Sequence, residues 1–193
     1  DVTEPLAKAS RRRVENLKKR GIRGFILKKD SPSCGKERVR VYRNGHAKKT
    51  GTGLFAQTLM DAWPNLPVED EGRLNDRRLR ENFMCRVFTY DRWRNMVEGG
   101  ADLKAIREFH ANHKLLLLAH NPVVCRSLGR LVAAMKPKLE EQDLMAYENA
   151  LMTALAKPAR VGGHVNVLEH ITGFLKRDLG PAQKADIKRV IAE

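Results

Sequence analysis

The chain has 193 residues, 42% of them hydrophobic, and carries 37 Lys and Arg against 23 Asp and Glu, a formal net charge of +14. This length and apolar content are sufficient for one large folded domain or two small ones. No apolar run approaches the roughly 20 residues of a membrane-spanning helix. The N-terminal residues also mix acids with bases and lack an apolar secretion core, so the sequence predicts a cytoplasmic protein without a membrane partner.

The three cysteines, Cys34, Cys85 and Cys125, are widely spaced and form no CxxC pair. Their odd number and spacing argue against a disulfide framework and fit cytosolic thiols. The excess of positive charge points to a polyanionic partner, above all nucleic acid, because each phosphate that a cation neutralises releases condensed counterions. The alternative is a basic soluble protein that has no such partner.

Strand-like and helical patterns alternate in the first half of the chain. A helix that ends at Gly21 is followed by an apolar strand at residues 22–27 and by a strand or hairpin arm at 39–45, which closes with an Asn-Gly turn. A glycine turn then opens a helix at 51–63, and an extended segment follows at 65–72. This alternation predicts an α/β unit with a parallel sheet.

From Asp76 onward the apolar residues recur at helical spacing, and no strand pattern appears. The predicted helices cover residues 77–97, 103–120, 122–135, 139–156 and 164–179, and another begins at Pro181. The predicted fold class is therefore α/β, a partial parallel-sheet domain over residues 1–75, followed by an all-α domain over residues 76–193. The first helix of that domain, residues 76–99, is interpreted as a linker. Few strands are available for an independent sheet, which suggests that the chain is part of something longer.

The residues Ser31-Pro32-Ser33-Cys34-Gly35, here called the SPSCG loop, follow the first predicted strand. Proline keeps the residue before it extended and Gly35 permits a sharp turn, so Cys34 should project from a tight loop at the carboxyl end of a strand. Open α/β sheets bind ligands at that edge. A thiolate there suits a nucleophile or a metal or cluster ligand. An ordinary loop cysteine is the alternative.

Two other features carry weaker signals. Gly51 and Gly53 precede a predicted helix whose free amides and dipole favour a bound anion, although a simple turn explains them equally well. His113 and His120 lie seven residues apart on one helical face, but further ligands at zinc spacing are missing. Capping, core hydrogen bonds or phosphate contacts are the preferred interpretations of these histidines.

The segment KPARVGGH, residues 157–164, is predicted to be a mobile basic loop ahead of a helix. Lys157, Arg160 and His164 surround its glycine pair. A loop of this kind suits contacts to a phosphate backbone, and a solvated connector between helices is the alternative.

Long motifs of the chain occur in the order found in a known pair of fused domains. The first half resembles the carboxyl-terminal half of the thiouracil desulfidase family in the motifs DVTEPL, ILKKDSPSCG and GTGLFAQTLMDAWPNLPVEDEGRLND. The second half resembles the helical YbgA-type domain, often fused behind it, in RENFMCRVFTYDRW, HKLLLLAHNP, LGRLVA and HVNVLEHITGFLKRDL.

The resemblance implies an iron-sulfur enzyme. Desulfidases of this family hold a four-iron, four-sulfur cluster (4Fe-4S) by three cysteines and leave one iron open to take sulfur from a thiolated pyrimidine. The fused forms resemble enzymes that convert 4-thiouridine in transfer RNA (tRNA) to uridine, with the helical domain binding the RNA. By position, Cys34 matches a cluster cysteine. Ser31 matches a serine near the substrate, which would donate a hydrogen bond or relay a proton as the sulfur leaves.

The resemblance implies that the helical domain binds RNA, and the basic loop then makes Lys157, Arg160 and His164 the expected RNA-binding residues, with Lys114 and Arg126 as further candidates. Their charge fits a partner whose affinity depends on phosphate contacts.

One part of the family pattern is missing. Two further cluster cysteines and a catalytic glutamate belong to a portion that would precede Asp1, and Cys85 and Cys125 match no ligand motif. The family's helical domain also continues beyond Glu193. The chain is therefore expected to be a fragment, inactive alone, of an iron-sulfur tRNA thiouridine desulfidase. The alternatives are a non-catalytic nucleic-acid-binding helical module and a desulfidase of free thiouracil, which a net charge of +14 disfavours.

Overall fold

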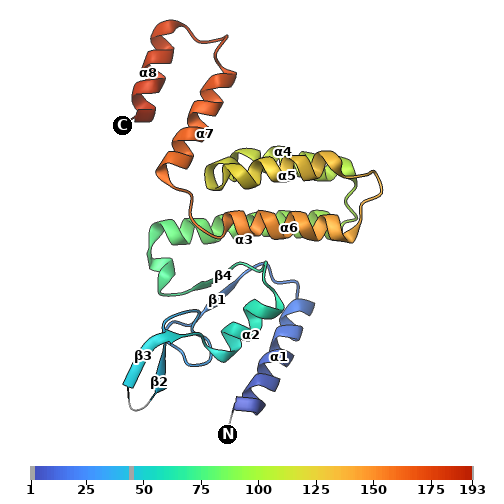
Figure 1. Ribbon diagram of the computed structural model, residues 1–193, viewed down its shortest axis with the longest axis vertical. Helices are drawn as coiled ribbons and strands as arrows, with labels where there is room; N and C mark the ends of the chain where they lie inside the picture. The colour runs from blue at the N-terminus through green and yellow to red at the C-terminus, as the bar shows by residue number, and fades with distance from the viewer. Residues whose placement is uncertain (1–2, 44–45, 193) are drawn as a thin grey trace. The chain divides into compact units, whose positions relative to one another are not determined.

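The computed structural model describes residues 3–43 and 46–192 (Figure 1). The chain divides into two compact units, Asp1–Arg94 and Asn95–Glu193. The division therefore falls within the last turn of one helix, and most of that helix lies with the first unit. Each unit is described separately below.

The first unit combines a small parallel strand pair, a hairpin and helices. Its elements are α1 (Thr3–Lys19), β1 (Phe25–Leu27), β2 (Val39–Arg43), β3 (His46–Gly51), α2 (Leu54–Ala62), β4 (Val68–Asp70), the 3-10 turn η1 (Arg73–Asn75) and α3 (Arg77–Glu98). Strands β1 and β4 run parallel, with Phe25 opposite Val68 and Leu27 opposite Asp70. The α/β class with a parallel pair is thus confirmed.

Helix α1 packs against α2 through its apolar face. Val14 and Leu17, three residues apart, are both buried there, and Gly21 follows the helix with a φ of 62°. A left-handed residue directly after the last helical turn is the usual helix stop, so the predicted helix end at Gly21 is confirmed.

Strands β2 and β3 form an antiparallel hairpin (Figure 1). The first arm, β2, agrees with the prediction, and the Asn-Gly pair expected to close it, residues 44–45, lies outside the described residues. The second arm, β3, is not predicted by the sequence pattern. Its sequence, HAKKTG, contains no alternation of apolar and polar residues, because it is a solvated arm rich in lysine.

The second unit is helical throughout its described residues, as predicted. Its elements are α4 (Leu103–His120), α5 (Pro122–Ala134), α6 (Glu141–Leu155), α7 (Val161–Phe174) and α8 (Pro181–Ala192). Helix α4 packs against α5, α6 and α7, α5 packs against α6, and α7 packs against α8. The fully buried side chains at these contacts include Ile106, Leu117, Leu128, Tyr147, Leu151 and Leu155.

Polar caps fix the helix boundaries of this unit. The Asp102 carboxylate accepts a hydrogen bond from Ala105 N at 2.8 Å at the start of α4. The Asn121 side chain accepts from the amides of Val123 and Val124, each at 3.1 Å, at the start of α5. Because Ser, Thr, Asp and Asn satisfy free amides in this way, the boundaries of both helices are visible in the sequence.

The predicted basic loop at residues 157–164 is partly helical, which corrects the expectation. Helix α7 begins at Val161 and contains the glycine pair. A Cβ atom on Gly163 would overlap the backbone carbonyl of Ala119 at the end of α4. The glycine at position 163 thus allows close packing between α4 and α7 instead of breaking a helix.

Among the helices in the described ranges, none has both the length and the apolar character required to cross a membrane.

Candidate functional site

The SPSCG loop closes on itself at the carboxyl end of β1. Gly35 N donates to the Ser31 carbonyl oxygen at 2.8 Å, and Cys34 N donates to Ser31 Oγ at 3.2 Å. The loop therefore forms a tight turn at the sheet edge where open α/β sheets bind ligands, as its sequence predicts.

The side chains of the loop form a hydrogen-bonded chain. Ser33 Oγ lies 3.3 Å from Ser31 Oγ and 3.4 Å from Cys34 Sγ. All three residues are half-buried. Ser33 connects the serine and the cysteine that sequence reasoning singled out, although the sequence alone does not mark Ser33 as a site residue.

The loop backbone occupies the N-terminus of α2. The Ser33 carbonyl oxygen accepts from Phe55 N at 2.8 Å and from Ala56 N at 3.2 Å, and Gly53 N donates to the Gly35 carbonyl oxygen at 2.8 Å. These backbone amides donate to carbonyl oxygens of the loop and are therefore not available to an anion. Gly51 and Gly53 thus belong to a structural turn, which is the alternative that the sequence offered. A Cβ atom on Gly53 would overlap the Ser33 carbonyl group, which explains the glycine at this position.

A buried carboxylate, Glu69, lies in β4 beside the loop. Glu69 Oε1 lies 2.9 Å from Lys36 Nζ, 2.9 Å from Arg73 Nε and 2.9 Å from the backbone amide of Asp70. Burial by itself raises the pKa of Glu69, but the hydrogen bonds from Asp70 N and Lys36 and the charges of Lys36 and Arg73 outweigh it and lower the pKa below its usual value. The Glu69 carboxylate is therefore held ionised.

A polar pocket of about 330 Å³ opens at the same ends of β1 and β4. Its lining residues are Lys29, Asp30, Glu37, Arg38, Lys49, Asp70, Gly72 and Arg73. Asp30 and Arg38 both have positive φ angles, 56° and 59°, on the two sides of the SPSCG loop. Non-glycine residues rarely adopt this conformation, and such strain gathers near functional sites.

In the second unit, a pocket of about 660 Å³ brings together residues that the sequence predicts separately. Lys157 and Arg160 line it together with Arg126 of α5 and His120 of α4. His120 Nδ1 lies 2.9 Å from the Lys157 carbonyl oxygen, which fixes the start of the segment that carries Lys157. We call this cavity the α4–α7 pocket.

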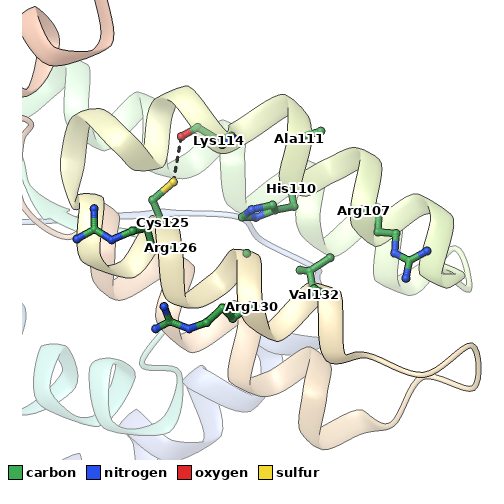
Figure 2. A pocket seen from close by; sticks show the side chains of 10 residues that line it. Arg107, His110, Ala111, Lys114, Cys125, Arg126, Arg130 and Val132 are labelled. Carbon is green, nitrogen blue, oxygen red and sulfur yellow. Dashed lines mark hydrogen bonds between the residues drawn. The ribbon is translucent and has the colours of Figure 1, made fainter. Parts of the chain in front are cut away.

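A second cavity, of about 710 Å³, lies between α4 and α5 and is called the α4–α5 groove (Figure 2). Its lining residues are Arg107, His110, Ala111, Lys114, Cys125, Arg126, Gly129, Arg130, Val132 and Ala133. The predicted candidates Lys114 and Arg126 both belong to it, and Arg126 lines both cavities.

Sequence reasoning missed the other polar residues of this groove. Arg107, His110 and Lys114 follow the i, i+3, i+7 spacing of one helical face, and Arg126 and Arg130 are an i, i+4 pair. That spacing is a signal in the sequence, but only the packing of α4 against α5 shows that the two sets meet.

The two halves of the chain resemble different known proteins, as their sequence motifs predict. Residues 1–71 match the family model described as 2-thiouracil desulfurase, and residues 114–193 match the model described as a protein of unknown function, DUF1722. The chain joins a desulfurase-like segment to a YbgA-like segment. The uncharacterized protein YbgA of Escherichia coli (strain K12) is 25% identical over 119 residues, which cover 61% of this chain and 70% of that relative. No solved structure matches.

The desulfurase-like segment contains Ser31 and Cys34, and the YbgA-like segment contains Lys114, Arg126, Lys157, Arg160 and His164. His164 lies within the first turn of α7 and close enough to His120 that its charge lowers the pKa of that residue, after the larger effect of burial. It does not line the α4–α7 pocket.

Two histidines of α4, His113 and His120, make hydrogen bonds within the fold. His113 is buried, its ring is stacked on Phe109 and its Nδ1 lies 2.8 Å from the Phe109 carbonyl oxygen. The interpretation of His113 as a core residue is confirmed. The contact between His120 and the Lys157 carbonyl oxygen likewise connects two helical segments.

The thiols of the chain do not form a cluster site by themselves. No group of three or more metal-ligating side chains exists among the described residues. Cys85 lies in α3, and Cys125 is buried in α5 with its Sγ donating to the Lys114 carbonyl oxygen at 3.5 Å. Burial raises the pKa of both thiols, which disfavours the thiolate form that iron requires. Of the three thiols, only Cys34 lies in the loop that follows β1, so the described residues do not fit a complete 4Fe-4S cluster.

Proposed function

We propose that this chain takes part in the removal of sulfur from thiolated uridine in tRNA, converting 4-thiouridine to uridine in the cytoplasm. The desulfurase-like segment would act on the thiolated base, and the YbgA-like segment would bind the tRNA. The observation that carries the proposal is the hydrogen-bonded chain from Ser31 through Ser33 to Cys34, at the carboxyl end of β1 in the segment that matches 2-thiouracil desulfurase.

Ser31 is suited to contact the pyrimidine. Its Oγ accepts from Cys34 N, which fixes the oxygen, and its hydroxyl proton is directed either to Ser33 Oγ or to a substrate atom. A hydroxyl held in this way can donate to the pyrimidine as the carbon–sulfur bond breaks, because a positioned donor stabilises negative charge that develops on the ring.

Cys34 is proposed as one ligand of a 4Fe-4S cluster, and the remaining thiolates would lie upstream of Asp1. Ser33 Oγ is near enough to donate to a Cys34 thiolate, and hydrogen bonds to a ligating sulfur tune the potential of such clusters. On this proposal the 193-residue chain is inactive alone.

The proposal of RNA binding rests on the gathering of cations in the YbgA-like segment. Lys157 and Arg160 line one cavity, Lys114 lines the next, and Arg126 lines both. In the described part of the chain none of these four residues is paired with a carboxylate. Unpaired cations gathered on α4, α5 and the connector before α7 are suited to contact phosphates.

The test is to incubate tRNA that contains 4-thiouridine with this chain and with a version extended upstream of Asp1, both prepared without oxygen. Iron and sulfide content and the remaining 4-thiouridine are then measured, the latter by mass spectrometry of the nucleosides. We expect iron and desulfidation in the extended version, and we expect Cys34→Ser to abolish both. Cys85→Ser is the matched control and should keep its iron.

The outcome also separates the alternatives. Normal iron content in the Cys34→Ser variant would disprove the ligand assignment. Tight tRNA binding without iron in either version would favour the non-catalytic binding module. Equal activity on free thiouracil and on tRNA would favour a desulfidase of the free base.

A further inference from the structure

We propose that the α4–α5 groove binds one unpaired nucleotide of the RNA, with the base between the two helices and its phosphates at the basic rim. This inference rests on the proposed RNA-binding function and adds a site at which the RNA must be single-stranded.

The size of the groove suits such an occupant. Its volume of about 710 Å³ lies within the range of about 300–1,000 Å³ typical of sites for small molecules. A phosphate backbone alone needs only a charged surface, whereas a depression of this size also leaves room for a base beside the charges.

Small or apolar side chains also line the groove, among them the buried Val132 and the exposed Ala111 and Ala133. A Cβ atom on Gly129 would lie 3.6 Å from His110 Nε2. The imidazole edge therefore faces residue 129 at van der Waals distance, and a side chain larger than a methyl group at this position would extend into the groove beside it. Figure 2 shows His110 and Val132 in the space between α4 and α5.

His110 offers an aromatic surface in a fixed position. Its Nδ1 lies 3.1 Å from Tyr147 Oη, and the two rings meet edge to face with centroids 6.0 Å apart. Burial, followed by the charge of Lys114, lowers the pKa of His110, so its imidazole is neutral at neutral pH. Unpaired RNA bases commonly stack on side chains of this kind.

The rim of the groove is cationic. Arg107, Lys114, Arg126 and Arg130 are all exposed, and within residues 3–43 and 46–192 none of them forms an ion pair. The three arginine side chains extend away from the helices in Figure 2. Arginine presents a planar fork of donors that matches phosphate oxygens.

Arg126 connects this groove to the α4–α7 pocket, where Lys157 and Arg160 lie. One strand can therefore place successive phosphates along both cavities. A nucleotide matches both features in one unit, with a base for the apolar part of the lining and phosphates for the cationic rim, whereas carboxylate side chains match the rim alone.

The first test fills the groove without changing its charge. Gly129→Leu places a side chain beside His110, and Leu has a higher helix propensity than Gly, so α5 is not weakened. Gly173→Leu is the matched control, because a Cβ atom on Gly173 meets nothing within 4 Å. Affinity of the full chain is measured by fluorescence anisotropy for a single-stranded RNA and for a duplex of the same sequence.

We expect Gly129→Leu to weaken single-stranded binding about tenfold, the usual effect of removing one base-stacking interaction, and to leave duplex binding within about twofold. Gly173→Leu should alter neither. Equal affinities of the two variants for single-stranded RNA would overturn the groove assignment while the proposed RNA-binding function stands. Failure of the unaltered chain to bind either RNA would instead contradict the proposed function itself.

A second variant and a competition experiment keep the test decisive if Gly129→Leu does not fold, as judged by circular dichroism. Ala133→Leu fills the groove from an exposed position of α5 and should reproduce the selective loss. Uridine monophosphate should displace single-stranded RNA more effectively than inorganic phosphate at equal concentration. Equal displacement by the two would show that no base enters the groove and would overturn the proposal.

Discussion

Lys36 Nζ lies 2.9 Å from Glu69 Oε1. This ion pair joins Lys36, the residue that follows the SPSCG loop, to Glu69 of β4. The two residues are 33 positions apart in the sequence. Glu69 also accepts from Arg73, whose Nη1 lies 2.7 Å from Glu37 Oε1. The loop is therefore held on one side by α2 and on the other by this ion-pair network.

We expect Glu69→Gln to destabilise the first unit by about 2 kcal/mol, because a buried network of charged hydrogen bonds loses its anion. The expected loss is moderate because solvent partly screens the two cations that remain. Both tryptophans of the chain, Trp63 and Trp93, belong to this unit, so urea unfolding followed by tryptophan fluorescence reports its stability.

Glu71→Gln is the matched control for that experiment. Glu71 pairs with Lys28 on an exposed surface, and a pair of this kind contributes about 0–1 kcal/mol. Equal losses in the two variants would contradict the role assigned to the Glu69 network.

The same carboxylate predicts a dependence of stability on pH. The pKa of Glu69 is lowered in the folded state, so its stabilising contribution is fully present above the unfolded value of about 4.3 and is lost as the pH falls through the folded value. The difference in unfolding free energy between the unaltered chain and Glu69→Gln should therefore shrink from pH 6 to pH 3. A difference that grows toward acid would mean that the carboxylate is protonated in the fold.

Gly53→Ala should displace the SPSCG loop from α2, since the added methyl group overlaps the Ser33 carbonyl group. We expect a loss of about 1–3 kcal/mol in the stability of the first unit, the usual cost of overpacking, and a changed rate of Cys34 labelling by a thiol reagent. Thr52→Ala, at the exposed neighbouring position, should stay within about 0.5 kcal/mol. Unchanged labelling in Gly53→Ala would show that the loop does not depend on this contact.

The glycine pair of α7 offers two adjacent substitutions with opposite expected effects. Gly163→Ala should destabilise the second unit by about 1–3 kcal/mol, because its methyl group overlaps the Ala119 carbonyl. Gly162→Ala should be neutral or stabilising by up to about 1 kcal/mol, since its methyl group meets nothing within 4 Å. Hydrogen exchange of the α4 and α7 amides measures the change in stability that each variant causes. Equal changes in Gly163→Ala and Gly162→Ala would contradict the close packing of these helices.

Charge reversal of Lys157 and Arg160 should weaken tRNA binding and make it less dependent on salt, because fewer counterions are released. We expect the slope of log affinity against log salt to become shallower by about 1 for each phosphate that the variant no longer neutralises. Affinity measured between low and moderate salt tests this expectation. Charge reversal of Lys184, which lies in α8 outside both cavities, is the control. A loss of tRNA affinity as large as that of the double variant would indicate a general effect of net charge.

The helices of the second unit are predictable because local chemistry defines their ends. Predicted residues 103–120 agree with α4, since Asp102 caps its start and Asn121 follows its end. The predicted start of α7 is three residues late, because a glycine pair usually signals a break. Only the packing of Gly163 against Ala119 explains why glycine belongs inside this helix.

The site is predictable only where its residues are neighbours in the sequence. Ser31 and Cys34 can be singled out within one loop, whereas the contact of Glu69 with Lys36 joins residues 33 positions apart that only the fold brings together. The arginines of the α4–α5 groove lie on two helices, and no local pattern shows which of their faces meet. Side chains that the fold alone brings together leave little trace in a single sequence.

Asn121 is the single residue between α4 and α5, and it fixes both of them. Its backbone N–H donates to the Leu117 carbonyl oxygen at 2.7 Å. Its side-chain Oδ1 accepts from the backbone amides of Val123 and Val124 at the start of α5. Pro122 then restricts the backbone further. These hydrogen bonds restrict the backbone where α4 turns into α5, the two helices that line the groove. A partner proposed to bind there would meet a site that is already ordered, so most of the entropic cost of ordering would fall on the partner.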